Sequence, residues 1–510
     1  MITTETSARW HRAGRPLDHR ALRWLPLVVG LVSLGLGAVA CVCYARADLQ
    51  LSHYDARGHL VVARRVIDSI TPGWRQIGAV WLPLPHLLNL VPVQVDAFYR
   101  TGLSAIAISM LAFAAATYAC SRIILEATGS RLAAVAGTLV LALNPDVLYL
   151  QATPMTEPLL LGLMTLSVLA LFIWIARGAT RHQHLAGWLL AASCLCRYEA
   201  WPATVAALAA GTLAIRWQGR RWRDAIRAIA VVAAYPAASV LGFIVVSRVT
   251  VGEWLVSTGF FVPDNPDMGR PFEAAASVWW GTHQLSGYGP LLLGVAGLLM
   301  LIVAVLRSRA PAGLLVFIAL AGAAVLPWYA FVSGHPFRIR YMVPLIPAVA
   351  VFAGIGVGLA RRARWIAAAL LLACVAVETA PFHGRSPMVL EAQWDRDNAR
   401  GRRAVTACLE REYRGEKIMA SMGSLGHYMQ ELSREGLALR DFLHEGNGDI
   451  WLAALKAGPR THVGWVLIEE TAEGGDMLAV RARLNPRFLR GFSRICEGGG
   501  VALYRRTSLP

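Results

Sequence analysis

Long apolar stretches without charged residues recur through the first three quarters of this 510-residue chain. A helix crosses roughly 30 Å of hydrocarbon with about 20 such residues. Hydrophobic residues make up 56% of the chain and charged residues 16%, against about 25% charged residues in a soluble domain. Eleven stretches cover all or most of a crossing, the fifth and sixth being short enough to form one kinked pair: 25–45, 101–121, 132–150, 158–176, 185–196, 200–215, 228–247, 288–306, 311–332, 341–360 and 365–380. The sequence therefore predicts a mainly α, polytopic transmembrane helix bundle.

The arginines indicate how this bundle is oriented. A net charge of +17 would suggest nucleic-acid binding in a soluble protein, but here the arginines precede the first span or fall in every second connection. Such connections are cytoplasmic by the positive-inside rule. We therefore expect no nucleic-acid partner. We also expect a cytoplasmic tail over residues 1–23, an uncleaved first span, and a C-terminus outside the plasma (inner) membrane after eleven crossings.

The composition changes after residue 380. Residues 24–380 form the predicted transmembrane domain, whereas residues 381–510 contain no stretch long enough to span and carry charged, polar and turn-forming residues. The stretches "EKIMASMG" and "HVGWVLIEE" are typical of buried strands, and "RRAVTACLERE" and "DIWLAALKA" have helical spacing. We expect a small extracytoplasmic α/β domain. Its two cysteines, Cys408 and Cys496, would meet oxidising conditions there and are candidates for a disulfide.

The first outer loop begins with "LSHYDARGHLVVARRVIDSI", residues 51–70. Its apolar residues recur at three- and four-residue steps, which predicts an amphipathic helix at the outer interface. Asp55 stands at the start of this helix, where a carboxylate either caps the helix or performs chemistry. His59 is either a ligand-binding side chain or an ordinary interfacial residue. The proline-broken stretch after it, residues 76–92, is expected to lie at the interface or dip into the membrane.

Two further outer connections carry carboxylates. In "NPDVLYLQATPMTEPLL", Glu157 precedes a span on the same side as Asp55. An acid in a first helical turn has a simple explanation in the helix dipole, but two outer carboxylates also suit acid/base chemistry on a membrane-bound substrate. In "CLCRYEAWP", Arg197 and Glu199 lie where two short spans meet. Ionisable groups at that depth are either paired with each other or functional.

Cations crowd one outer connection, against the positive-inside bias. The stretch "SGHPFRIRYMVPLIP" contains His335, Arg338, Arg340 and Tyr341. Arginine binds phosphate in a bidentate manner, so these side chains suit either a phosphate-bearing substrate or ordinary lipid headgroups.

Together, the acidic residue ahead of "HLVVARR", "TPMTEP", "CRYEAWP" and "RIRYMVPLIP" resemble the polytopic C-type glycosyltransferases. They are similar to the bacterial dolichyl-phosphate-mannose-protein mannosyltransferase-like branch, whose plan lipid A aminoarabinose transferases share. The resemblance covers roughly residues 20–380 and, weakly, "KIMASMGSLGHYM" in the tail. It implies transfer of a sugar, mannose or another hexose or pentose, from a polyprenyl-phosphate donor. The acceptor would be a hydroxyl of a glycan, lipid or protein at the outer face, with inversion at the anomeric carbon.

The resemblance also implies roles for individual residues. Asp55 would be the general base on the acceptor, and Glu157 would orient the acceptor or donor. Arg338 and Arg340 would hold the leaving phosphate. The other expected substrate-binding residues are His59, Arg57, Arg197, Glu199, His335 and Tyr341. Position 57 holds arginine where a two-acid DxD pattern would place its second acid, so no metal ligand set is assigned and no cofactor is indicated. Arg57 is instead a candidate to supply the positive charge that a metal would give.

Two other classes of protein remain as alternatives. A transporter or flippase of lipid-linked sugars usually shows repeated halves and polar residues near the bilayer midplane, whereas here the ionisable residues gather at one outer face. A membrane receptor with a sensing tail is the third candidate. The sequence shows no Gly-rich phosphate loop, which favours a lipid-linked over a nucleotide-linked donor.

Overall fold

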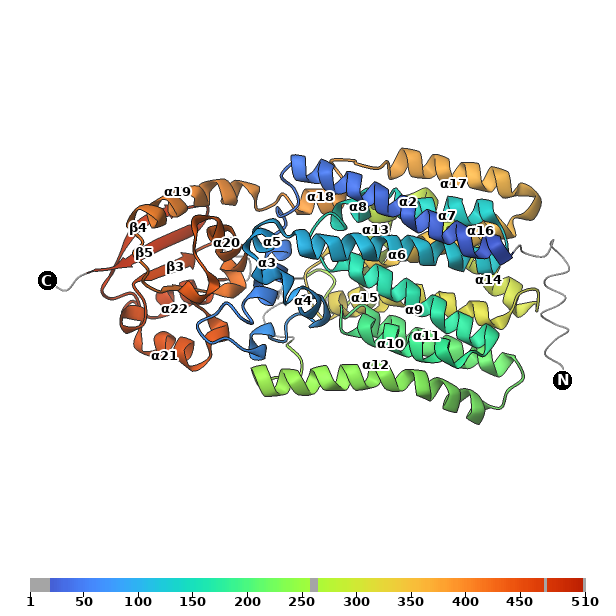
Figure 1. Cartoon of the computed structure of the whole chain (residues 1–510), viewed down its shortest axis with the longest axis horizontal. Helices are drawn as coiled ribbons and strands as arrows, with labels where there is room; N and C mark the ends of the chain where they lie inside the picture. The colour runs from blue at the N-terminus through green and yellow to red at the C-terminus, as the bar shows by residue number, and fades with distance from the viewer. Residues whose placement is uncertain (1–18, 257–264, 472–474, 508–510) are drawn as a thin grey trace.

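The computed structural model of the chain describes residues 19–256, 265–471 and 475–507. The predicted cytoplasmic tail therefore lies mostly outside the described residues. A long helix bundle and a small sheet domain lie end to end along the longest axis of the molecule (Figure 1). The helices of the bundle are α2 (His19–Arg46), α6 (Leu103–Thr128), α7 (Arg131–Ala142), α9 (Glu157–Arg177), α10 (Thr180–Cys194), α11 (Ala200–Trp217), α12 (Trp222–Val251), α14 (Tyr288–Leu306), η3 (Ala312–Ala324) with α15 (Val325–Val332), η4 (Ile339–Leu345) with α16 (Ile346–Leu359), η5 (Arg361–Ala363) and α17 (Arg364–Glu378).

Each of the eleven predicted spans contains a helix. Within the described residues, seven helices are long and apolar enough to cross a membrane, and these make the chain an integral membrane protein. The other four segments carry shorter or less apolar helices, so the number eleven stays a prediction. The predicted span over 132–150 is broken, because α7 ends at Ala142 and Asn144-Pro145 starts a separate short helix, α8 (Pro145–Leu150).

The outer loops contain helices of their own. The first has α3 (Tyr54–Arg64), η1 (Trp74–Ile77), α4 (Leu84–Asn89), η2 (Pro92–Gln94) and α5 (Asp96–Thr101). Around α4 and η2 the apolar side chains of Leu87, Leu88 and Val91 are exposed, as expected of an interfacial segment. A helix that the sequence did not predict, α13 (Pro271–Ser286), lies in the loop after α12.

The second part of the chain is an α/β domain built on a five-stranded sheet of order β2-β1-β3-β5-β4. Strand β1 pairs in parallel with β2 and β3, and β5 pairs antiparallel with β3 and β4. The predicted strands and helices of this domain correspond to β1, β3, α19 and α21. The elements are α18 (Pro387–Glu391), α19 (Arg396–Glu412), β1 (Ile418–Ala420), α20 (Met422–Leu432), η6 (Ser433–Glu435), η7 (Leu439–Asp441), β2 (Phe442–Leu443), η8 (Glu445–Asn447), α21 (Asp449–Ala457), η9 (Pro459–Thr461), β3 (Trp465–Glu469), α22 (Met477–Leu484), β4 (Phe492–Gly498) and β5 (Val501–Arg506).

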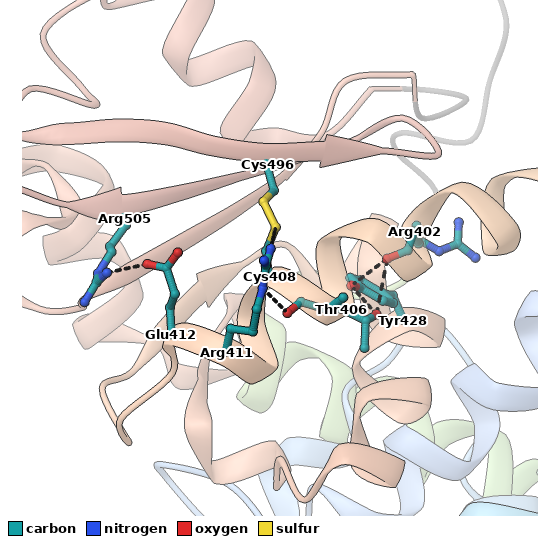
Figure 2. Close-up of a disulfide and its surroundings, with 9 residues drawn as sticks. Arg402, Thr406, Cys408, Arg411, Glu412, Tyr428, Cys496 and Arg505 are labelled. Carbon is teal, nitrogen blue, oxygen red and sulfur yellow. Dashed lines mark hydrogen bonds and ion pairs between the residues drawn. A yellow bond between two sulfur atoms is a disulfide. The ribbon is translucent and has the colours of Figure 1, made fainter.

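A disulfide links a helix to an edge strand of this domain. Cys408 of α19 and Cys496 of β4 form the bond, with their Cα atoms 6.6 Å apart (Figure 2). The disulfide that the sequence left open is therefore present. It joins the helix before the sheet to an edge strand 88 residues later.

The sheet domain docks on the first outer loop. Leu60 and Val61 of α3 share a buried apolar cluster with Leu425 and Tyr428 of α20. Arg57 of α3 forms an ion pair with Glu431 of α20, and further polar contacts join residues 68–76 to residues 439–447. Helix α3, which was predicted to be an amphipathic helix at the outer interface, packs against the sheet domain through Leu60 and Val61 and against the bundle through Ala56.

Candidate active site

A buried aspartate and an arginine from distant parts of the chain meet at the end of the bundle that carries the sheet domain. Asp55 is the second residue of α3, and its carboxylate accepts a hydrogen bond from Nη1 of Arg340 in η4. The helix cap is His53, whose Nδ1 accepts a hydrogen bond from the backbone N–H of Asp55 at 3.1 Å. The capping explanation of Asp55 is therefore wrong. Its carboxylate points to a cation and not to the helix backbone.

A second charged cluster lies at the start of α9. Arg197 Nη1 is 2.9 Å from Oε1 of Glu157 and 3.0 Å from Oγ1 of Thr156. Arg197 Nη2 is 2.7 Å from Oε1 of Glu199. The pairing of Arg197 with Glu199 is thus real, but the same guanidinium also faces Glu157. Glu157 is fully buried, and neither of its carboxylate oxygens accepts a hydrogen bond from any residue that the structure describes.

His59 lies within the electrostatic influence of both clusters. It lies one helical turn after Asp55, its ring centroid is 4.3 Å from that of Trp81, and its Nδ1 is 3.1 Å from Nε2 of His86 in α4. Burial lowers the pKa of His59 well below its usual range. The charges of Arg197 and Arg340 lower this pKa further, whereas the charge of Asp55 raises it. His59 is therefore a neutral imidazole that can donate or accept a hydrogen bond.

The electrostatics of Asp55 follow from its partner. Burial alone would raise the pKa of this carboxyl, but the charge and hydrogen bond of the Arg340 guanidinium hold it well below its usual range. Asp55 is therefore ionised in the resting protein. For His86, burial is the larger cause and the charge of Arg65 the smaller, and together they lower its pKa to about 3.

The remaining predicted residues of the cationic connection surround Arg340. Tyr341 places its ring 5.9 Å from the Arg340 guanidinium, and its hydroxyl is 3.2 Å from Nε2 of His335. His335 Nδ1 is 2.8 Å from the carbonyl oxygen of Pro336. Arg338 immediately precedes η4 and is partly buried.

Arg57 does not join this group. Its Nη1 is 2.6 Å from Oε2 of Glu431, and its Nε donates to the carbonyl oxygen of Leu51 at 2.8 Å. These contacts tie the first outer loop to the sheet domain, and the substrate-binding role of Arg57 stays a prediction. The residues that the structure describes include no group of three or more His, Cys, Asp or Glu side chains placed to hold a metal ion.

Sequence reasoning missed two side chains at the site. His86 lies in the stretch "PLPHLLN", where a single histidine among apolar residues was a usable signal. Glu391 gave no signal, because it lies in the tail, 338 residues after its partner His53. Its contact with His53 is therefore visible only in the folded chain.

The chain has the fold of ArnT, a polytopic C-type glycosyltransferase, with a sheet domain at one end of a helix bundle. Among solved structures, the chain is similar to ArnT, the lipid A aminoarabinose transferase, from Cupriavidus metallidurans, both bound to undecaprenyl phosphate and in the apo state. The TM-scores are 0.59 and 0.54, sequence identity is 13% in both cases, and the matches cover 93% and 92% of this chain and 97% of each ArnT chain. No protein-family model and no curated protein sequence matches the chain.

Proposed function

We propose that this protein is an inverting glycosyltransferase of the extracytoplasmic face of the plasma membrane. It moves a sugar, mannose or another hexose or pentose, from a polyprenyl-phosphate donor to a hydroxyl of a glycan, lipid or protein acceptor. The observation that carries this proposal is the buried Asp55–Arg340 pair beside Glu157 and Arg197, at the outer end of the bundle. One ArnT structure with this fold is bound to undecaprenyl phosphate, which supports a donor of that class.

The charges suit the two ends of the bond that breaks. As the bond between the anomeric carbon and the phosphate oxygen breaks, its electron pair leaves with the polyprenyl phosphate, and positive character develops on the sugar. Arg340 and Arg338 would stabilise the departing phosphate, and the carboxyl group of Glu157 would face the sugar. Asp55 would accept the proton of the acceptor hydroxyl while the hydroxyl oxygen forms its bond to the anomeric carbon. A single displacement of this kind inverts that carbon.

Arg340 connects donor binding to the basicity of Asp55. In the resting protein its guanidinium is engaged by the Asp55 carboxylate. A donor phosphate competes for the same guanidinium, and any share that it takes weakens the stabilisation of ionised Asp55. The pKa of Asp55 then rises, so the carboxylate becomes a better base when the donor is bound.

The test uses purified protein in nanodiscs with undecaprenyl-phosphate-linked mannose, a second hexose and a pentose, and a cell-envelope extract as acceptor. We expect Asp55→Asn to reduce turnover by at least about 10²-fold, the lower end for a lost general base, while undecaprenyl-phosphate binding persists. Glu126→Gln is the matched control, since Glu126 pairs with Arg122 at 2.6 Å and with Arg177, far from the site.

Two results would contradict the proposal. One is wild-type turnover by a normally folded Asp55→Asn protein, judged by its melting temperature. The other is movement of the intact lipid-linked sugar across a vesicle membrane without bond cleavage, which would indicate the transporter class instead.

A further inference from the structure

His53 is buried between the start of α3 and the tail of the chain. Its Nδ1 accepts a hydrogen bond from the backbone N–H of Asp55 at 3.1 Å, and its Nε2 lies 3.3 Å from Oε1 of Glu391. The side chains of His53 and Glu391 are 0% and 2% exposed. One imidazole thus contacts both the residue proposed as the base and a buried carboxylate from α18.

The two contacts determine which nitrogen of His53 carries the proton. A ring nitrogen that accepts a hydrogen bond is unprotonated, so the proton of the neutral ring must lie on Nε2. From there it is donated to the Glu391 carboxylate. The opposite tautomer would point the Nδ1 proton at the N–H of Asp55, placing two donors against each other. Glu391 therefore selects the tautomer that can cap α3.

Glu391 is itself fixed from the bundle. It ends α18, whose Met388 N–H donates to Oδ1 of the buried Asp146 at 2.8 Å. Asp146 belongs to α8, and α18 lies beside α8 (Figure 1). The carboxylate of Glu391 is thus held by a helix packed on the bundle, independently of α3.

We propose that Glu391 is a positioning residue that acts through His53 to fix the first turn of α3. That turn carries Asp55, so Glu391 sets where the carboxylate stands relative to Arg340. This inference rests on the proposed function, in which Asp55 accepts the acceptor proton. Displacing a catalytic group by about 1 Å can cost roughly 10²-fold in rate.

The first test is kinetic. Glu391→Ala should lower kcat about 10- to 100-fold and leave the KM for the donor nearly unchanged, because Glu391 does not touch the phosphate-binding arginines. Glu391→Gln should recover most of the loss, since its amide oxygen still accepts the His53 proton. Asp397→Ala is the control, an acid of the next helix with a 91% exposed side chain. A donor KM that rises with an unchanged kcat would overturn the proposal.

The second test separates positioning from general stability. In the Asp55→Asn background, Glu391→Ala should cause no further loss of turnover, because the group that it positions is gone. An equal fold loss in both backgrounds would show that Glu391 acts independently of Asp55 and would overturn the proposal. The melting temperature of each Glu391→Ala protein is compared with that of its parent, so that a loss of activity through unfolding is recognised.

A third measurement needs no turnover. Hydrogen exchange of the peptide covering residues 53–60 should be faster in Glu391→Ala than in the wild type and in Asp397→Ala. Unchanged exchange would overturn the link between Glu391 and α3, even if no sugar proved to be transferred. Faster exchange in a protein that transferred no sugar would reject the proposed function and keep the structural role of Glu391.

Discussion

Arg340 has two partners in the proposed reaction, the Asp55 carboxylate at rest and the donor phosphate during turnover. Because Asp55 is buried, its ionised form depends on the nearby guanidinium. The same pair therefore sets the acid limit of activity. In the wild type, the pKa of Asp55 lies below its usual range, so kcat/KM should stay flat as pH falls from 7 to about 5.

Replacing Arg340 should reverse this behaviour. In Arg340→Gln, burial remains and the favourable charge is gone, so the pKa of Asp55 should rise above its usual value. The base is then lost by protonation as pH falls, and kcat/KM should acquire an acid limb that the wild type lacks. The measurement is the pH profile of kcat/KM between pH 5 and 8.

A matched control is Arg440→Gln, which removes a guanidinium 2.9 Å from Oδ1 of the buried Asp68 in the same outer loop. Its pH profile should keep the wild-type shape. A flat acid side in Arg340→Gln, or a new acid limb in Arg440→Gln, would contradict the assignment of Asp55 as the titrating base.

The sequence could locate these residues but could pair only Arg197 with Glu199, its near neighbour. Asp55, Glu157, Arg197 and Arg340 attract notice because ionisable groups beside apolar spans are costly unless they are paired or functional. The contacts of Asp55 with Arg340 and of Glu157 with Arg197 are a matter of tertiary structure. The pair of Asp55 with Arg340 joins residues 285 positions apart, and no local pattern encodes it. For the same reason, neither the role of Arg57 nor the cap formed by His53 was predicted.

At the scale of elements, small residues let the helices of the bundle approach closely. A Cβ added at Gly137 of α7 would lie 2.6 Å from Cα of Gly354 and 2.9 Å from the carbonyl oxygen of Ala350, both in α16. These are backbone atoms of a neighbouring helix, so neither can move aside as a side chain could. The contact is a small-residue interface of the kind that membrane helices use where lipid replaces water.

Gly137→Ala should therefore destabilise the protein by about 1–3 kcal/mol, the usual cost of overpacking, despite the better helix propensity of alanine. Gly35→Ala is the control, because an added Cβ at Gly35 of α2 meets nothing within 4 Å. The measurement is the melting temperature of both variants in one detergent. A drop in Gly35→Ala as large as that in Gly137→Ala would mean that the close contact is not the cause.

Hydropathy predicted most of these elements and missed others for identifiable reasons. Every long apolar run contains a helix, since the requirement for a span is local to the sequence. The apolar stretch of α13 is short and is followed by Thr282, His283 and Gln284, so it does not read as a span, and α18 has five residues, which is too short to show a period. Helix α3 was predicted as amphipathic, but both its apolar residues Leu60 and Val61 and its charged residue Arg57 contact the sheet domain, and Arg57 lies 374 positions before its partner Glu431.

The whole molecule has two chemically different ends. The arginine-rich connections between α11 and α12 and between α16 and α17 lie at the end opposite the sheet domain (Figure 1). The sheet domain carries the disulfide between Cys408 and Cys496, and structural disulfides persist in oxidising compartments. Both features agree with the proposed orientation, in which the arginine end is cytoplasmic and the sheet domain and the Asp55 cluster are extracytoplasmic.

This orientation is testable with a thiol reagent that cannot cross the membrane. Asp449, at the start of α21, and Arg220, in the turn between α11 and α12, are both exposed. In a background with the exposed Cys43 replaced by serine, Asp449→Cys should be labelled in intact spheroplasts. Arg220→Cys should be labelled only after lysis, since the charge of its connection keeps it inside. Labelling of Asp449→Cys only after lysis would place the sheet domain in the cytoplasm, and the proposed extracytoplasmic site with it.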